Sequence, residues 1–181
     1  MSRTPLEHIT EAEKQLLWER AQKLVEHHLI DPSDNKDKYL LFQLSTASFA
    51  IDGQCIREVL KLPQITTIPC CPSFVSGVIN VRGHMTSVLD LSVVLGLSPP
   101  PFSGPGWAII LASPEHEFAV RVDSISDITL ISPEEIQPLP AIFTGLGATF
   151  ARGLWKEQTI VLDGAQLLAD EHFVVSESVE L

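Results

Sequence analysis

Three aspartates are the side chains of this sequence best placed for acid–base chemistry. Asp90, Asp123 and Asp163 each follow an apolar segment that has the character of a strand. Carboxylates that converge in one pocket can act as general acid and general base, so a small carboxylate-based hydrolase is one hypothesis. The alternative is that each aspartate caps the turn or helix after its strand. Short helical segments follow Asp90 and Asp163, which favours capping.

Other patterns for catalysis or metal binding are weak. Cys70 and Cys71 are adjacent and lack C-x-x-C spacing, and the six histidines are scattered, with His27 and His28 facing different directions on a helix. The sequence contains no G-x-S-x-G, H-E-x-x-H, Walker or G-x-G-x-x-G motif. The Gly104–Gly106 segment contains Pro105 and is typical of a surface loop. We therefore predict no catalytic residues, no metal and no cofactor.

Composition and charge exclude further classes. The 181 residues carry a formal net charge of −11, from 12 Lys and Arg against 23 Asp and Glu, without a basic cluster. Binding to nucleic acid or to anionic membranes needs concentrated positive charge, so neither is expected. The N-terminus lacks the apolar run of a signal peptide, and the strongly apolar run 107–112 is too short to cross a bilayer. We predict a cytoplasmic protein without direct membrane insertion.

The first 37 residues form a separate segment in this prediction. Thr10–Glu13 has the form of a capping box, and apolar residues then recur at helical spacing until Asp31 and Pro32. We expect an N-terminal α-helix and a polar linker over residues 1–37. The apolar stripe of the helix needs cover, either from the body of the protein or from a partner. A scaffold that associates mainly through this helix is therefore an alternative function.

After residue 38 the chain changes to short strands in an apparent internal repeat. The segment Phe49–Ile51 is similar to Phe118–Val120, and Val88–Asp90 is similar to Val161–Asp163, in each case about 70 residues later. Short strands remove their open edges most simply by closing into small barrels. We predict a mainly β fold of two similar β-barrels with short connecting helices. The predicted domain spans 38–170, with subdomains 40–97 and 107–163 divided by the Pro/Gly-rich loop 98–106, and a C-terminal tail at 171–181.

Two charged residues stand in apolar strand context. Glu58 precedes Val59, and Arg82 lies between Val81 and Gly83. Strand alternation could place Glu58 and Arg82 on facing surfaces as an ion pair. Two unrelated solvated charges are the open alternative. An exposed pair contributes about 0–1 kcal/mol, so its value would lie in shaping a binding surface.

Several blocks together resemble the CheW family of chemotaxis coupling proteins. The similarity runs from about residue 39 to 168. Its most specific part is the run Gly77-Val-Ile-Asn-Val-Arg-Gly83 in this order with other blocks, which are Phe49–Ile51, Ile56–Val59, Ile68–Pro69, Val88–Leu91, Val120–Ile128 and Ile136–Pro138.

The resemblance implies two SH3-like barrels and a non-enzymatic adaptor. Family members bridge the cytoplasmic signalling tip of chemoreceptors and the regulatory domain of a CheA-type histidine kinase. Glu58 and Arg82 match the family's paired acid and base. The positions associated with partner contacts are matched by Ile56, Val59, Gly77 and Val78.

The sequence also departs from the family pattern. Ser87 stands where the family usually has Pro, and Ser92 where it has Arg after Asp-Leu. These departures and the extra N-terminal helix leave a second pathway open. The adaptor would then serve a non-flagellar chemosensory array that controls surface motility, pili or a second messenger.

Overall fold

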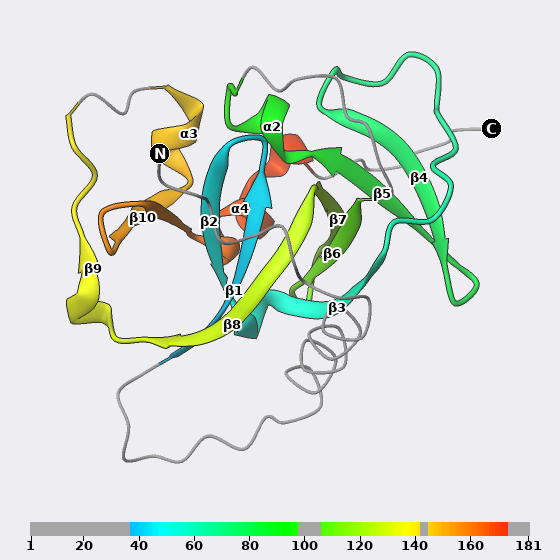
Figure 1. Ribbon diagram of the computed structural model, residues 1–181. Helices are drawn as coiled ribbons and strands as arrows, with labels where there is room; N and C mark the ends of the chain where they lie inside the picture. Colours follow the sequence, from blue (N-terminus) through cyan, green and yellow to red (C-terminus); the bar gives the residue numbers. More distant parts are fainter. Residues whose placement is uncertain (1–36, 98–105, 142–144, 174–181) are drawn as a thin grey trace, which may run out of the picture.

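The computed structural model describes residues 37–97, 106–141 and 145–173 (Figure 1). This part of the chain is mainly β, with two sheets and short helical turns, as predicted. The predicted N-terminal helix and linker, the loop 98–105 and residues 174–181 lie outside the described residues. Within the described ranges, no helix is long and apolar enough to span a membrane.

The first sheet contains six strands in the order β8-β1-β2-β11-β10-β9. Most neighbours are antiparallel, whereas β2 and β11 run parallel, with Ala50 opposite Val161. The strands are β1 (Asp37–Leu44), β2 (Ala47–Asp52), β8 (Ser124–Ile131), β9 (Ile136–Gln137), β10 (Ala151–Trp155) and β11 (Thr159–Leu162).

The second sheet contains five strands in the order β3-β6-β7-β5-β4. It has one parallel pair, β5 with β7, in which Leu89 lies opposite Val120. The strands are β3 (Ile56–Lys61), β4 (Val75–Val81), β5 (His84–Asp90), β6 (Trp107–Ala112) and β7 (Glu117–Val122).

Each sheet combines strands from both halves of the sequence. The β1–β2 hairpin, from the first half, pairs with β8 and β11 of the second half. The β6–β7 hairpin, from the second half, pairs with β3 and β5 of the first. Neither sheet therefore corresponds to one of the predicted subdomains 40–97 and 107–163. The hairpin that begins each half completes the sheet of the other half.

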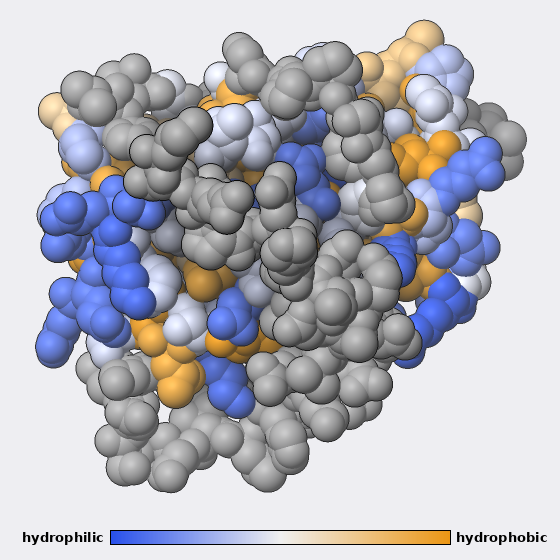
Figure 2. All heavy atoms as spheres, in the orientation of Figure 1, coloured by the Kyte–Doolittle hydropathy of each residue, from blue (hydrophilic) through white to orange (hydrophobic). Residues whose placement is uncertain are grey.

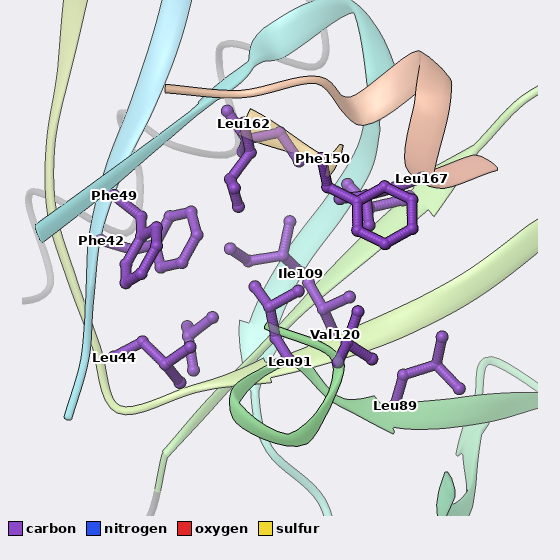
Figure 3. Close-up of a cluster of buried hydrophobic side chains, with 14 of the residues drawn as sticks. Phe42, Leu44, Phe49, Leu89, Leu91, Ile109, Val120, Phe150, Leu162 and Leu167 are labelled. Atoms are coloured by element: carbon purple, nitrogen blue, oxygen red, sulfur yellow. The ribbon is translucent and has the colours of Figure 1, made fainter. Parts of the chain in front are cut away.

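The main hydrophobic core lies between the sheets and takes residues from both (Figure 3). Phe42 and Phe49 stack within it at a ring-centroid distance of 5.7 Å. Ile109 and Val120 enter the same cluster from the second sheet. This shared core explains why the apolar patterns of the two halves are so similar, because both supply strands to one interior.

Each sheet also buries apolar side chains on the face opposite this core. Tyr39 and Trp155 belong to such a cluster on the first sheet, and Ile79 and Ile110 to one on the second. A sheet that is apolar on both faces must curl around the smaller cluster or cover it with other elements. This arrangement favours the predicted barrels.

The connection from β3 to β4, residues 62–74, links opposite edges of the second sheet. Thr66 and Val78 exchange two backbone hydrogen bonds, each with an N···O distance of 2.9 Å. Approach of the two edge strands is what closure of a barrel requires. The barrels themselves stay a prediction.

Short helical turns join the strands. The sequence predicts helical turns near residues 91–95, 133–135 and 165–169. They are α2 (Leu91–Val94), η2 (Pro133–Glu135) and α4 (Gly164–Ala169). Further turns are η1 (Gly53–Cys55), α3 (Leu146–Thr149) and η3 (Glu171–Phe173).

One sequence-based expectation about these turns is wrong. The sequence pattern predicts a strand over about Gly147 to Leu154, but residues 147–149 are helical and β10 begins only at Ala151. Gly147 makes this possible, since an ideal Cβ there would lie 2.8 Å from the Leu95 carbonyl oxygen at the end of α2. The predicted tail at 171–181 begins with a structured turn, because Phe173 is buried in the main core.

Candidate functional site

The β4–β5 hairpin presents Arg82 at its tip, at one side of the molecule (Figure 1). Arg82 and Gly83 occupy the two turn positions with φ angles of 52° and 91°. Two successive positive φ angles match the turn type whose twist suits a hairpin. The Asn80 side-chain oxygen accepts a hydrogen bond from the Gly83 N–H at 2.7 Å, which closes the turn. The backbone that carries Arg82 is therefore held in place while its side chain stays exposed.

Arg82 forms the predicted ion pair with Glu58 on β3. The Arg82 Nη2 to Glu58 Oε1 distance is 2.7 Å, and the side chains are 75% and 17% exposed, respectively. A pair open to water on the arginine side contributes about 0–1 kcal/mol to stability. It also joins the two edge strands of the second sheet. Its main physical effect is to fix the position of an exposed guanidinium, with donors left for a partner's carboxylate.

An apolar surface accompanies this charge pair on the same hairpin. Val78 is half-buried, and Met85 is 63% exposed on β5. Met85 lies opposite Asn80 and next to the turn. Figure 2 shows one face of the molecule, on which small hydrophobic areas interrupt the hydrophilic side chains. Sequence reasoning did not single out Met85 or Asn80, although the Asn-x-x-Gly spacing was a readable turn signal.

Three of the predicted contact residues have interior positions. Ile56 is 9% exposed and Val59 1% exposed, and both belong to the main core. Gly77 is buried at a β-bulge with a φ angle of 140°. Its backbone approaches Thr66 so closely that a Cβ would overlap the carbonyl oxygen. Of the six predicted residues, Glu58, Arg82 and Val78 are therefore the ones whose side chains reach the surface.

The three aspartates with candidate acid–base chemistry each accept a backbone hydrogen bond. Asp90 accepts a hydrogen bond from the Ser92 N–H at 3.0 Å, and Asp163 from the Gln166 N–H at 2.9 Å. These contacts cap α2 and α4, so the capping interpretation is confirmed for both. Asp123 accepts from the Ser45 N–H at 2.6 Å. Within the described part of the chain, no cluster of three or more His, Cys, Asp or Glu side chains is placed to hold a metal ion.

A second group of titratable residues lies near the start of the first sheet. Burial raises the pKa of the Tyr39 hydroxyl, while the nearby Arg152, which donates to Tyr39 Oη at 3.1 Å, lowers it. Burial also raises the pKa of Asp52 above its ordinary value. The pKa of the Cys55 thiol rises to about 11, first through burial and then through Asp52 and Asp163.

We expect Asp52→Asn to stabilise the protein at neutral pH. A carboxyl whose folded pKa is raised costs stability once pH rises through the interval between its unfolded and folded pKa values. The interval begins near 3.8, the ordinary value for Asp52. Asparagine removes the buried charge, and its oxygen can still accept from the Gln54 N–H, as Asp52 does at 2.8 Å.

Urea unfolding at a series of pH values measures this effect. The wild-type free energy of unfolding should fall relative to Asp52→Asn as pH rises from about 3.8 towards 7. Asp127→Asn, which makes the same replacement at an exposed position, is the matched control. A parallel pH profile for wild type and Asp52→Asn would contradict the prediction.

Comparison with known proteins adds the family. The model of the CheW-like domain matches residues 38–172. The chemotaxis protein CheW of Treponema pallidum is 28% identical over 155 residues, which cover 80% of this chain and 91% of that protein. A probable chemotaxis protein CheW of Rhizobium etli is 30% identical over 115 residues, covering 64% of this chain and 74% of that protein.

A solved structure agrees with these sequence matches. The scaffolding protein TtCheW from Thermoanaerobacter tengcongensis superposes with a TM-score of 0.62 at 26% identity, over 70% of this chain and 88% of that chain. The matched region contains both sheets, the β4–β5 hairpin and the Glu58–Arg82 pair. The chain belongs to the CheW-like domain family.

Proposed function

We propose that this chain is a non-enzymatic adaptor that couples chemoreceptors to a CheA-type histidine kinase. Its partners in this proposal are the cytoplasmic signalling tip of the receptor and the regulatory domain of the kinase. Relatives named chemotaxis protein CheW and scaffolding protein support this function. The two SH3-like barrels belong to the same proposal.

The observation that carries the proposal is the exposed ion pair on a rigid turn. Arg82 keeps 75% of its side chain exposed although it is paired with Glu58. Arginine is enriched among the residues that dominate binding energy at protein interfaces, and Met85 adds exposed apolar area beside it. A specific interface of standard size buries about 1,200–2,000 Å² in total, so this patch would form only its centre.

We expect Arg82→Ala to weaken binding to a partner by about tenfold to a hundredfold, because the turn loses the guanidinium it presents. The thermal midpoint should hardly change, since an exposed pair contributes about 0–1 kcal/mol. Titration calorimetry against the recombinant kinase regulatory domain and the receptor tip measures the affinity. Arg57→Ala is the matched control. Like Arg82, Arg57 is an exposed arginine in an ion pair, but it lies on β3 and its partner is Glu117.

The charge reversal Glu58→Arg with Arg82→Glu separates the pair from its individual charges. If the pair only fixes the turn, the double reversal should recover most of the binding that Arg82→Ala loses. If the partner recognises the Arg82 guanidinium, the double variant should bind as poorly as Arg82→Ala. Full binding of both partners by Arg82→Ala itself would overturn the site assignment.

The pathway served by the adaptor stays a prediction. Ser92, at one of the departures from the family pattern, is buried, and its hydroxyl donates to the Asp90 carboxylate. It thus strengthens the cap of α2 where an arginine would add a charge. A non-flagellar array is the alternative setting in this proposal.

A further inference from the structure

The connection between β3 and β4, which contacts Val78 through Thr66, contains two adjacent thiols. Cys70 is exposed and Cys71 is half-buried. Pro69 precedes the pair and Pro72 follows it, so the segment has little conformational freedom and lacks two backbone donors. The third cysteine, Cys55, packs against Gly164. Cys70 is therefore the exposed thiol, Cys71 is its half-buried neighbour, and Cys55 is a half-buried thiol elsewhere in the fold.

The backbone at Cys70 is unusual within the described part of the chain. Its φ angle is 63°, in the left-handed region. The other non-glycine residues with positive φ that the structure describes lie in hairpin turns, which require such angles: Ser45, Arg82, Lys156 and Glu157. Cys70 lies in a turn with Pro69 that is outside any hairpin, and a left-handed conformation costs a non-glycine residue about 1–2 kcal/mol. The strained residue is thus also the most accessible thiol.

The segment around these thiols is held on both sides. Before the pair, Thr66 exchanges two backbone hydrogen bonds with Val78 on β4. After the pair, the Phe74 carbonyl accepts from the Asp90 N–H at 2.7 Å, and the Phe74 ring packs on Phe173. A change of backbone angles between these anchors must be absorbed by one of them. Thr66 is exposed and its neighbour Ile65 packs on the smaller cluster of the second sheet, whereas Phe74 packs on the main core. The Thr66–Val78 contact is therefore the side that can change without repacking the main core.

We propose that Cys70 and Cys71 form a reversible redox site, which a peroxide oxidant closes into a vicinal disulfide that loosens Thr66 from the β4 edge. Adjacent α-carbons lie about 3.8 Å apart, below the usual range of about 4.4–6.8 Å across a disulfide. The pair must therefore change its backbone angles on closure. A strained, exposed disulfide of this kind is readily reduced again, as a regulatory bond requires.

The reaction balances with hydrogen peroxide as the oxidant. One thiolate attacks a peroxide oxygen, the O–O bond breaks, and a sulfenic acid and water result. The neighbouring sulfur then attacks the sulfenic sulfur, the S–O bond breaks, and a second water leaves. Two thiols lose two electrons, which reduce the peroxide. If Cys71 is oxidised first, Pro72 offers no N–H for a sulfenamide, so Cys70 is the adjacent nucleophile.

Peptide mapping of the full-length chain tests the chemistry. Trypsin separates residues 62–82, which contain both thiols, from residues 39–57, which contain Cys55. After peroxide treatment, the 62–82 peptide should lose the mass of two hydrogens, resist alkylation and recover with dithiothreitol. Cys55→Ser should behave like wild type, whereas Cys70→Ser and Cys71→Ser should not form the bond. A disulfide-linked dimer, or only sulfinic acid at Cys70, would overturn the site.

Hydrogen exchange tests the conformational step without any partner. Oxidation should speed exchange of the Thr66 and Val78 amides about tenfold in wild type and Cys55→Ser. Unchanged exchange in the oxidised protein would overturn that step. A third measurement, the affinity for the kinase regulatory domain, rests on the proposed function and should fall on oxidation. If the reduced protein did not bind the kinase domain, the proposed function alone would be contradicted. If reduced and oxidised protein bound equally well, control of binding by the disulfide would be contradicted.

Discussion

Gly77→Ala should destabilise the protein by about 3 kcal/mol, a large loss for the addition of one methyl group. An added Cβ would overlap the Thr66 carbonyl oxygen and lie 2.8 Å from Ile65 Cγ2. The backbone also has a φ angle of 140°, which side-chain-bearing residues rarely adopt. Steric overlap and backbone strain therefore add at one position. Urea unfolding, with the midpoint and slope compared to wild type, measures the loss.

Gly83→Ala is the matched control for this experiment. Gly83 also has a positive φ angle, 91°, but an added Cβ would have no neighbour within 4 Å. Its loss should be limited to the conformational cost, about 1 kcal/mol. The difference between the two variants measures the close approach of the β3–β4 connection to β4. Equal losses for Gly77→Ala and Gly83→Ala would show that this approach is not tight.

The same close approach occurs in the second half of the chain. A Cβ at Gly153 would overlap the Gln137 carbonyl oxygen and lie 2.7 Å from Ile136 Cγ2. Both glycines follow a bulge at the start of a strand, since the register shifts before Gly77 and before Gly153. The internal repeat inferred from Phe49 and Phe118 thus extends to backbone geometry. Sequence similarity between the halves did not reveal this correspondence of Gly77 and Gly153, because glycine is common and the residues around the two glycines differ.

Strand exchange between the halves could not be predicted from the sequence. Local alternation shows that β1 or β6 is a strand, but it contains no information on which distant strand pairs with it. Phe49 and Phe118 lie in one shared core, so their burial does not by itself say which sheet each strand joins. The choice depends on connection lengths and on packing between strands whose paired residues lie from 31 positions apart (Val88 and Ala119) to 111 positions apart (Ser48 and Thr159).

The sequence predicts the charged residues of the candidate site better than its apolar residues. Glu58 and Arg82 were identified because charged residues in apolar strands are unusual, and the structure pairs them. Ile56 and Val59 lie in the core because the register shifts between Ile56 and Glu58. A bulge of this kind changes the alternation of faces within one strand, so residues three apart can both point inward. Strict alternation in the sequence cannot detect it.

Phe173→Ala should cost about 3–5 kcal/mol, the usual range for deleting a buried phenylalanine. Phe173 is 7% exposed, and its ring centroid lies 5.5 Å from that of Phe74, 6.3 Å from Phe118 and 5.4 Å from Phe150. These rings come from the β3–β4 connection, β7 and the segment before β10. A single side chain near the end of the described chain therefore ties three separate parts of the fold together.

Two further variants give this prediction its controls. Phe173→Leu keeps most of the apolar volume. It should lower the free energy of unfolding by about 0.5–1.5 kcal/mol, which is what ring–ring contacts add beyond the burial of apolar area. His172→Ala removes a side chain that is 88% exposed and should change stability by less than about 0.5 kcal/mol. Urea unfolding followed by circular dichroism separates the three. If Phe173→Ala unfolded at the same urea concentration as His172→Ala, the C-terminal turn would not hold the β3–β4 connection, and Phe74 would need another anchor.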